Sequence, residues 1–210
     1  MGRPPASIRS NDLVLTLMLL NEDSFGRYKL SKYLGLSKAK TRAILEFLTE
    51  HDLAVAQKGR GGTKLTTKGY KLVTEFRNYC KLDWGQQMTE ISPDLLPEAT
   101  HKAVIYMNIA DKQTTGLYER DMAVRAGAAG AITLIRSDDG STWEFPDLGT
   151  TDQPEHPPDQ VTVIDPTMAN SYNILSIAFG DTIGVIYPGI VSIVMYHLSD
   201  KLVPLLPDQD

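Results

Sequence analysis

The chain has 210 residues, a formal net charge of −5, and 42% hydrophobic and 22% charged side chains, the proportions of a soluble globular protein with one large or two small domains. Its single cysteine, Cys80, excludes an intramolecular disulfide and indicates a reducing, cytoplasmic location, where we expect a buried thiol. No stretch reaches the roughly 18 apolar residues of a membrane span, since the closest, residues 183–198, contains Pro188 and Gly189, and no signal peptide is expected.

Charge is distributed unevenly along the chain. Residues 1–85 carry 15 Lys and Arg against 8 Asp and Glu, a formal charge of +7. Residues 86–210 carry 6 against 18, a formal charge of −12. This asymmetry is typical of a half that binds nucleic acid joined to a half that does not touch it.

Three helices are expected in the first half. Apolar spacing predicts helices over residues 8–20 and 28–34, and Gly35 ends the second one in the left-handed conformation that helix ends often need. Ser37 is a good N-cap for a third helix over residues 38–50. Two helices joined by a short turn that contains glycine are typical of a helix-turn-helix.

The third helix is expected to have an apolar face and a basic face. The apolar face carries residues that recur at spacings of three and four: Thr41, Ile44, Leu45 and Leu48. Lys38, Lys40 and Arg42 then lie outward in the first two turns, where a recognition helix contacts bases and phosphates in the major groove. For this helix taken alone, a solvated basic face is the alternative.

A β-hairpin is expected directly after this helix. Residues 53–57 and 63–66 alternate like paired strands around a glycine-rich tip at residues 58–62. The tip carries two cations, Lys58 and Arg60. A hairpin with a basic tip in this position is the wing of a winged helix.

Residues 8–80 as a whole resemble the winged-helix domains of many prokaryotic transcription regulators, with the segment Leu65-Thr-Thr-Lys-Gly-Tyr70 closing the hairpin into another helix. Asp52 stands where these domains usually have glycine, and aspartate tolerates the left-handed conformation of that turn. The resemblance implies a domain that binds double-stranded DNA.

We expect the DNA contacts to come from the start of the third helix and from the hairpin. The residues concerned are Ser37, Lys38, Lys40, Thr41, Arg42, Lys58, Arg60 and Lys64. Their cations would neutralise phosphates, and Lys40 or Arg42 would also reach guanine O6 and N7.

A long helix is expected over residues 67–82. Its apolar stripe runs through Tyr70, Val73, Phe76 and Cys80. Winged-helix proteins often dimerise through such a helix, so we expect a homodimer that reads two half-sites. The alternative is that the stripe covers its own domain.

The second half predicts a small α/β domain. Residues 1–82 would form the winged-helix domain and residues 83–99 a linker, followed by a β-α-β-β-α-β-α order over residues 100–210. The expected strands are 101–109, 131–136, 141–145, 161–164 and 181–187, and the expected helices are 114–126, 167–179 and 189–202, with an acidic loop at 146–159. This order indicates helices packed on a mixed sheet, and an α+β or α/β class for the whole chain.

Residues 118–135, followed by the hairpin sequence Trp-Glu-Phe-Pro146, resemble the C-terminal domain of a family of archaeal two-domain winged-helix proteins. That domain has no assigned function. The resemblance therefore implies an architecture and a regulatory role, and it does not supply a ligand.

Candidate ligand-binding residues lie on the first helix of this domain. Arg120, Asp121 and Arg125 crowd its surface, and an arginine near a carboxylate could bind a small-molecule effector. The alternative is an ordinary surface ion pair between Asp121 and Arg125, which are four residues apart on the helix.

The four histidines show no metal-ligand spacing, and no nucleophile with a neighbouring base is legible, so we expect no metal, no cofactor and no enzymatic activity. Two other functions remain open: the assembly of transcription complexes through the acidic half, and a small-molecule enzyme with an attached winged helix. We predict a DNA-binding transcription regulator whose C-terminal domain senses a ligand or mediates assembly.

Overall fold

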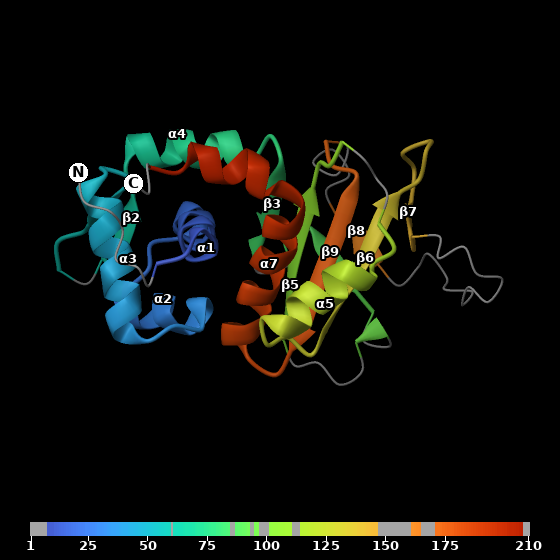
Figure 1. Cartoon of the computed structure of the whole chain (residues 1–210), viewed down its shortest axis with the longest axis horizontal. Helices are drawn as coiled ribbons and strands as arrows, with labels where there is room; N and C mark the ends of the chain where they lie inside the picture. Colours follow the sequence, from blue (N-terminus) through green and yellow to red (C-terminus); the bar gives the residue numbers. More distant parts are fainter. Residues whose placement is uncertain are drawn as a thin grey trace.

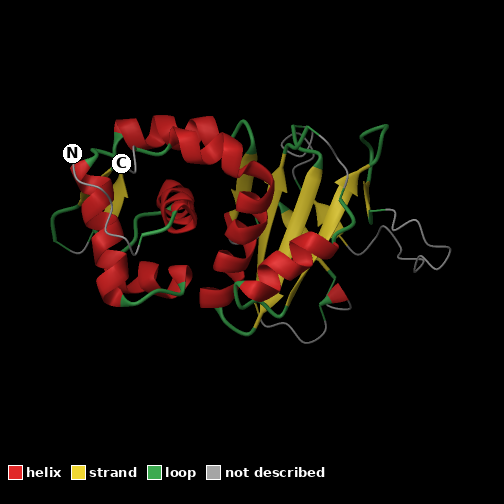
Figure 2. Cartoon of the chain, in the orientation of Figure 1, coloured by secondary structure: helices red, strands yellow, loops and turns green. Residues whose placement is uncertain are grey.

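The computed structural model describes residues 8–59, 61–84, 87–92, 95–96, 101–110, 114–146, 161–164 and 171–207. It is a mixed α+β fold, with a helical part on one side and antiparallel sheets on the other (Figure 1). Figure 2 shows the same division, with most helices gathered beside the sheet.

The helical part follows the expected order. It contains α1 (Ser10–Glu22), α2 (Arg27–Leu34), α3 (Lys38–Glu50), β1 (Ala54–Ala56), β2 (Thr63–Leu65) and α4 (Thr67–Phe76). β1 pairs with β2 in antiparallel register, with Ala54 opposite Leu65. The side chain of Ser37 accepts a hydrogen bond from the backbone N–H of Lys40, and this cap begins α3 as predicted. Asp52 has a φ of 57°, which confirms the left-handed turn before the hairpin.

A five-stranded antiparallel sheet forms the other side. Its strands lie in the order β3 (Cys80–Asp83), β5 (His101–Met107), β9 (Ile174–Gly180), β6 (Gly130–Arg136) and β7 (Trp143–Glu144). A separate pair joins β4 (Thr89–Ile91) to β8 (Val161–Val163). This half also contains two helices. α5 (Leu117–Arg125) lies between β5 and β6 in the chain, and α7 (Ile183–Leu202) comes after β9 and is continued by η4 (Val203–Leu205). All pairings among the described strands are antiparallel, so the expected mixed sheet is wrong.

The expected helix over residues 67–82 is also wrong in its second half. α4 ends at Phe76, and Cys80–Asp83 forms β3, which pairs with β5. Phe76 and Cys80 are both buried, and their spacing of four fits a continuous helix as well as a helix followed by a strand facing the same core. The expected domain boundary between residues 82 and 83 therefore falls inside a strand, and the expected linker contains β4; the division into domains stays a prediction.

Two further predictions near the C-terminus are wrong: an expected helix is a strand, and an expected strand is part of a helix. Ile174–Gly180, expected within a helix, is the strand β9 in the middle of the sheet. Residues 183–187, expected as a strand, form the first turns of α7. Six of the seven residues of Ile174–Gly180 are buried, so this strand is apolar on both faces and its apolar residues also fit a helical spacing, as Leu175 and Phe179 do. The acidic loop expected at 146–159 lies, after Pro146, outside the described residues.

The helix α7 joins the two halves of the molecule. It packs on β5, β9 and α5 on one side and on α1 and α2 on the other, and Figure 1 shows it between the helices and the sheet. One hydrophobic core contains Leu17 of α1, Leu30 of α2, Ile190 of α7 and Ile105 of β5. By length and composition the segment Ile183–Leu205 could cross a membrane, but nine residues of α7 are buried, which is the position of a core helix.

The thiol of Cys80 lies in this shared core. It is 1% exposed, and burial raises its pKa to about 12. The expectation of a buried thiol is therefore confirmed, and the group stays protonated and unreactive at neutral pH.

A close backbone contact fixes α2 against α7. Gly35, the C-cap of α2, has a φ of 63°, and a Cβ added to it would lie 2.2 Å from the carbonyl oxygen of Gly184. A Cβ on Gly184 would in turn lie 2.9 Å from the carbonyl oxygen of Lys32. Pro188 has no N–H to donate to the Gly184 carbonyl four residues earlier, so this carbonyl can face Gly35 instead. The two halves meet here with no side chain between their backbones.

We predict that Gly35→Ala destabilises the protein by at least about 3 kcal/mol, because it adds a clash with Gly184 to the cost of a left-handed alanine. Gly59→Ala is the matched control: its φ is 74°, but an added Cβ meets nothing within 4 Å. The control should cost about 1 kcal/mol. Urea unfolding measures both values. Equal losses in the two variants would show that the contact with Gly184 contributes nothing.

Candidate nucleic-acid interface and the cleft behind it

A tyrosine between two lysines stands on the outer face of α2 and α3. Tyr28, in the first turn of α2, is 61% exposed. The Nζ atom of Lys32 lies 5.3 Å from the centre of its ring, and that of Lys38 lies 4.9 Å away. Both ammonium groups are thus held on the solvent side by cation–π contacts. The sequence predicted Lys38 here but missed Tyr28 and Lys32, which the exposed positions of the preceding helix could have indicated.

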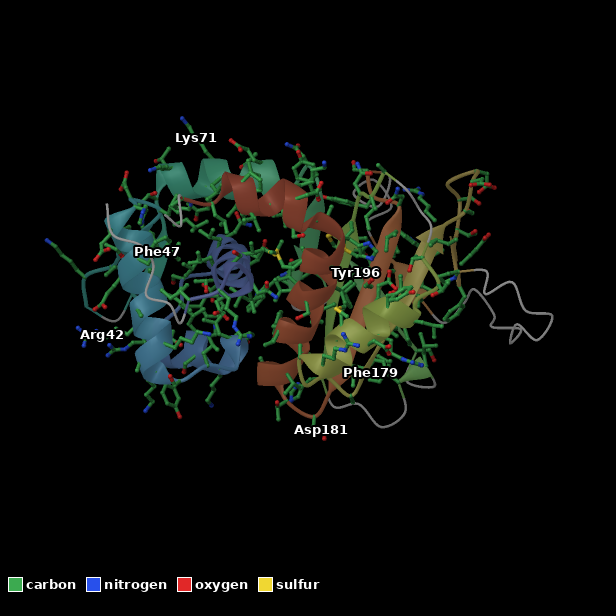
Figure 3. All side chains as sticks on the ribbon, viewed as in Figure 1. Arg42, Phe47, Lys71, Phe179, Asp181 and Tyr196 are labelled. Atoms are coloured by element: carbon green, nitrogen blue, oxygen red, sulfur yellow. The ribbon has the colours of Figure 1, made fainter. Side chains whose placement is uncertain are left out.

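Arg42 extends this face by one turn of α3. Its side chain is 65% exposed and projects into solvent (Figure 3). The Nε atom donates a hydrogen bond to Glu46 at 2.7 Å, and this bond raises the pKa of the guanidinium. The pair is fully solvated, so it orients Arg42 without removing its terminal N–H donors from solvent.

The hairpin adds cations beside this face. Lys58 and Lys64 are exposed, with Lys64 on the outer side of β2. Gly59 and Gly62 both have positive φ values, which the tight tip requires. Arg60, the other predicted cation of the tip, lies outside the described residues.

Three residues predicted to contact DNA are engaged elsewhere. The Oγ atom of Ser37 accepts the N–H of Lys40, and the fully buried Thr41 donates its hydroxyl hydrogen to the carbonyl of Ser37. The Nζ atom of Lys40 lies 2.7 Å from the carboxylate of Asp12 on α1, and the Lys40 side chain is only 22% exposed. Helical spacing predicts Lys40 outward, but its ion pair with Asp12 turns the side chain toward α1. Thr41 is buried, as its place on the apolar face of α3 predicts, whereas Lys40 is less exposed than its helical position predicts. The contacts of both residues with DNA stay a prediction.

Lys40 faces a cleft between the two halves of the molecule. The cleft has a volume of about 390 Å³. It is lined by α1, by the turn between α2 and α3, by the start of α3, and by α5 and α7. Its polar and charged lining residues are Arg9, Asn11, Asp12, Lys40, Arg125 and Ser192.

The three candidate ligand residues on α5 do not form one site. Arg120 donates to Asp121 at 3.1 Å, and both side chains are about half exposed. The carboxylate of Asp121 thus pairs with its neighbour in sequence and not with Arg125, which was the expected alternative. Of the three predicted residues, Arg125 alone lines the cleft.

A buried glutamate on the inner side of α5 was missed. Glu119 is 0% exposed, and its Oε1 atom accepts hydrogen bonds from Thr114 and, at 2.6 Å, from Nε2 of His197 on α7. Burial raises the pKa of Glu119, but the hydrogen bonds from His197 and Thr114 outweigh it and leave the pKa below its ordinary value. The signal in the sequence was the apolar residue Ala123, which lies one helical turn after Glu119 and therefore on the same face.

Within the described part of the chain, no group of three or more His, Cys, Asp or Glu side chains is arranged to hold a metal ion. The cations of the described residues gather in two places: an exposed basic face on α2, α3 and the hairpin, and a second set in the cleft.

The fold defines a mixed α+β protein with antiparallel sheets. Residues 98–192, from just before β5 into α7, match the model of a family described as a domain of unknown function, DUF4443. Among solved structures, the hypothetical protein PH0730 from the archaeon Pyrococcus horikoshii OT3 is similar, with a TM-score of 0.69 and 15% sequence identity. The similarity covers 95% of this chain and 97% of that one, so both share the fold of both halves. No curated protein matches the chain.

We predict that Glu119→Gln destabilises the protein at pH 7 by about 1–3 kcal/mol, because a buried charge-assisted hydrogen bond is lost. Since the folded pKa lies below the ordinary value of about 4.3, the carboxylate's contribution is present above that pH and is lost as the pH falls through the folded pKa. The difference from the unmodified protein should therefore shrink at pH 3.5 in urea unfolding. Asp121→Asn, an exposed carboxylate on the same helix, is the control and should change little. A difference that grows at low pH would contradict the assignment.

Proposed function

We propose that this protein is a cytoplasmic, DNA-binding transcription regulator in which residues 8–76 act as a winged helix. The observation that carries the proposal is the exposed basic face, on which Lys32 and Lys38 flank Tyr28 and Arg42 continues along α3. In the winged-helix reading, α3 is the recognition helix and the hairpin β1–β2 is the wing.

The position of these cations supports contacts to a duplex. Lys38 and Arg42 are one helical turn apart on the solvent side of α3, where they can approach bases or phosphates in a major groove. Lys32 and Tyr28 come from the preceding helix, which in a helix-turn-helix crosses the backbone. Lys58 and Lys64 would contact the phosphates beside the groove. The same face is interrupted by the carboxylate of Glu46, which Arg42 already neutralises.

The acidic half would then serve regulation. Residues 86–210 carry a formal charge of −12, so they would not contact DNA and are free to sense a ligand or to mediate assembly. A role in assembling transcription complexes is the second candidate, favoured by the same excess of carboxylates, which would suit a basic protein partner.

We predict that Lys38→Gln and Arg42→Gln each weaken binding to a mixed-sequence DNA duplex in a fluorescence anisotropy titration. Each should also lower the slope of log K against log salt by about 0.9, the value for one lost phosphate contact. Lys71→Gln is the matched control, because Lys71 is an exposed lysine of α4, well away from Arg42 (Figure 3). It removes the same charge from the same half and should leave the slope unchanged.

Two results would count against the proposal. One is an absence of duplex binding by the unmodified protein at low salt, which would favour the assembly role. The other is an equal loss of affinity in Lys71→Gln and Arg42→Gln, which would indicate attraction by net charge without a defined face.

We also propose that the protein is a homodimer, because a two-fold dimer would read two half-sites. The interface expected on residues 67–82 cannot supply it through Val73, Phe76 and Cys80, since these side chains are buried in the chain's own core. Of the expected stripe, Tyr70 alone is exposed, so a dimer that uses α4 would need to use Tyr70 and the outer side of the helix. Light scattering should give twice the 23.2 kDa of one chain, and a mass of one chain would remove the dimer.

A further inference from the structure

The cleft between the two halves has an excess of positive charge. Three cationic side chains, Arg9, Lys40 and Arg125, line it against one carboxylate, that of Asp12. The Oδ2 atom of Asp12 is already engaged twice, by the Nζ atom of Lys40 at 2.7 Å and by the backbone N–H of Arg9 at 3.0 Å. The acidic group in the cleft is thus used within the protein, and it does not neutralise the two arginines.

Arg9 and Arg125 are exposed cations that pair with no carboxylate in the part of the chain that the structure describes. They come from different halves, Arg9 from the start of α1 and Arg125 from the end of α5. Both border the same cleft, so an anion placed there could receive N–H donors from both guanidinium groups. Such planar, multiple donors match the oxygens of a phosphate or carboxylate group.

Other features of the lining suit an anion of small size. Arg9 is the N-cap of α1, so the positive end of this helix lies at the cleft. The amide of Asn11 and the hydroxyl of Ser192 add neutral hydrogen-bonding groups. The volume of about 390 Å³ lies within the usual range of small-molecule sites and is far too small for a DNA duplex.

We propose that this cleft is a binding site for a small molecule that carries a doubly charged phosphate group, held between Arg9 and Arg125. Lys40 is the third cation of the site and connects it to α3. Its Nζ atom would be shared between Asp12 and the ligand, so occupancy would alter the contact that holds the start of α3 against α1.

An effect on DNA binding rests on the function proposed above, whereas binding of the anion does not. Lys40 shares the first turns of α3 with Lys38 and Arg42. A ligand would change DNA affinity only if it bound more tightly to one arrangement of α3 than to another.

The test is isothermal titration of the full chain with inorganic phosphate, and in a second arm with pyrophosphate, in a low-salt buffer free of other multivalent anions. We expect saturable binding of one anion per chain. Arg125→Gln should weaken it at least about tenfold, the effect of losing a charged hydrogen-bond donor. Arg120→Gln is the matched control: it removes the same charge from the same helix, but Arg120 pairs with Asp121 and does not line the cleft. The control should bind within about twofold of the unmodified protein.

The outcomes separate this proposal from the one on DNA. The absence of saturable binding of both anions, or equal weakening by Arg120→Gln and Arg125→Gln, would overturn the site. Retention of full affinity in the double variant Arg9→Gln with Arg125→Gln would do the same. The double variant Lys38→Gln with Arg42→Gln should bind phosphate with the affinity of the unmodified protein, so a failure to bind DNA leaves the cleft site standing. Loss of phosphate binding in this double variant would count against the cleft site.

Discussion

The arrangement of the molecule depends on the contact between the backbones of Gly35 and Gly184. It lets the end of α2 lie directly on the first turn of α7, which is packed on its other side against the sheet. A side chain at either glycine would clash with the backbone of the other helix and would force the two helices to shift. Because α7 belongs to the core of both halves, the two sets of elements hold one another in place, although their charges and their chemistry differ.

This arrangement places cations of α3 on two different sides of the helix. Lys38 and Arg42 face solvent, whereas Lys40, between them in sequence, turns toward Asp12 and the cleft. Three cations within five residues of one helix therefore lie on two different surfaces. Any change in the cleft that acts on Lys40 acts on the first turns of α3, where the proposed DNA contacts are made, and no long chain of intermediate residues is needed.

Local signals were sufficient to predict the helical half as far as α4, which ends at Phe76 and not at residue 82. The cap at Ser37, the glycine at position 35 and the alternation in the hairpin act over a few residues, and the elements formed where these signals placed them. The segments near the C-terminus could not be predicted in this way. Ile174–Gly180 is apolar on both faces, so its apolar residues fit a helical spacing as well as a strand. The pairing of Lys40 with Asp12, and the burial of Glu119 against His197, likewise depend on neighbours distant in sequence.

The uneven distribution of charge along the chain makes the electric field differ between the two sides of the molecule. With a formal charge of +7 in residues 1–85 and −12 in residues 86–210, the field of the molecule would draw a polyanion toward α2, α3 and the hairpin and repel it from the sheet. A duplex so oriented meets the outer face of α3 and leaves the cleft, on its inner side, open to small anions. The cations of the cleft would otherwise compete for the same phosphates. Their position behind α3, between two halves that α7 holds together, would separate the proposed site for small anions from the proposed surface for DNA.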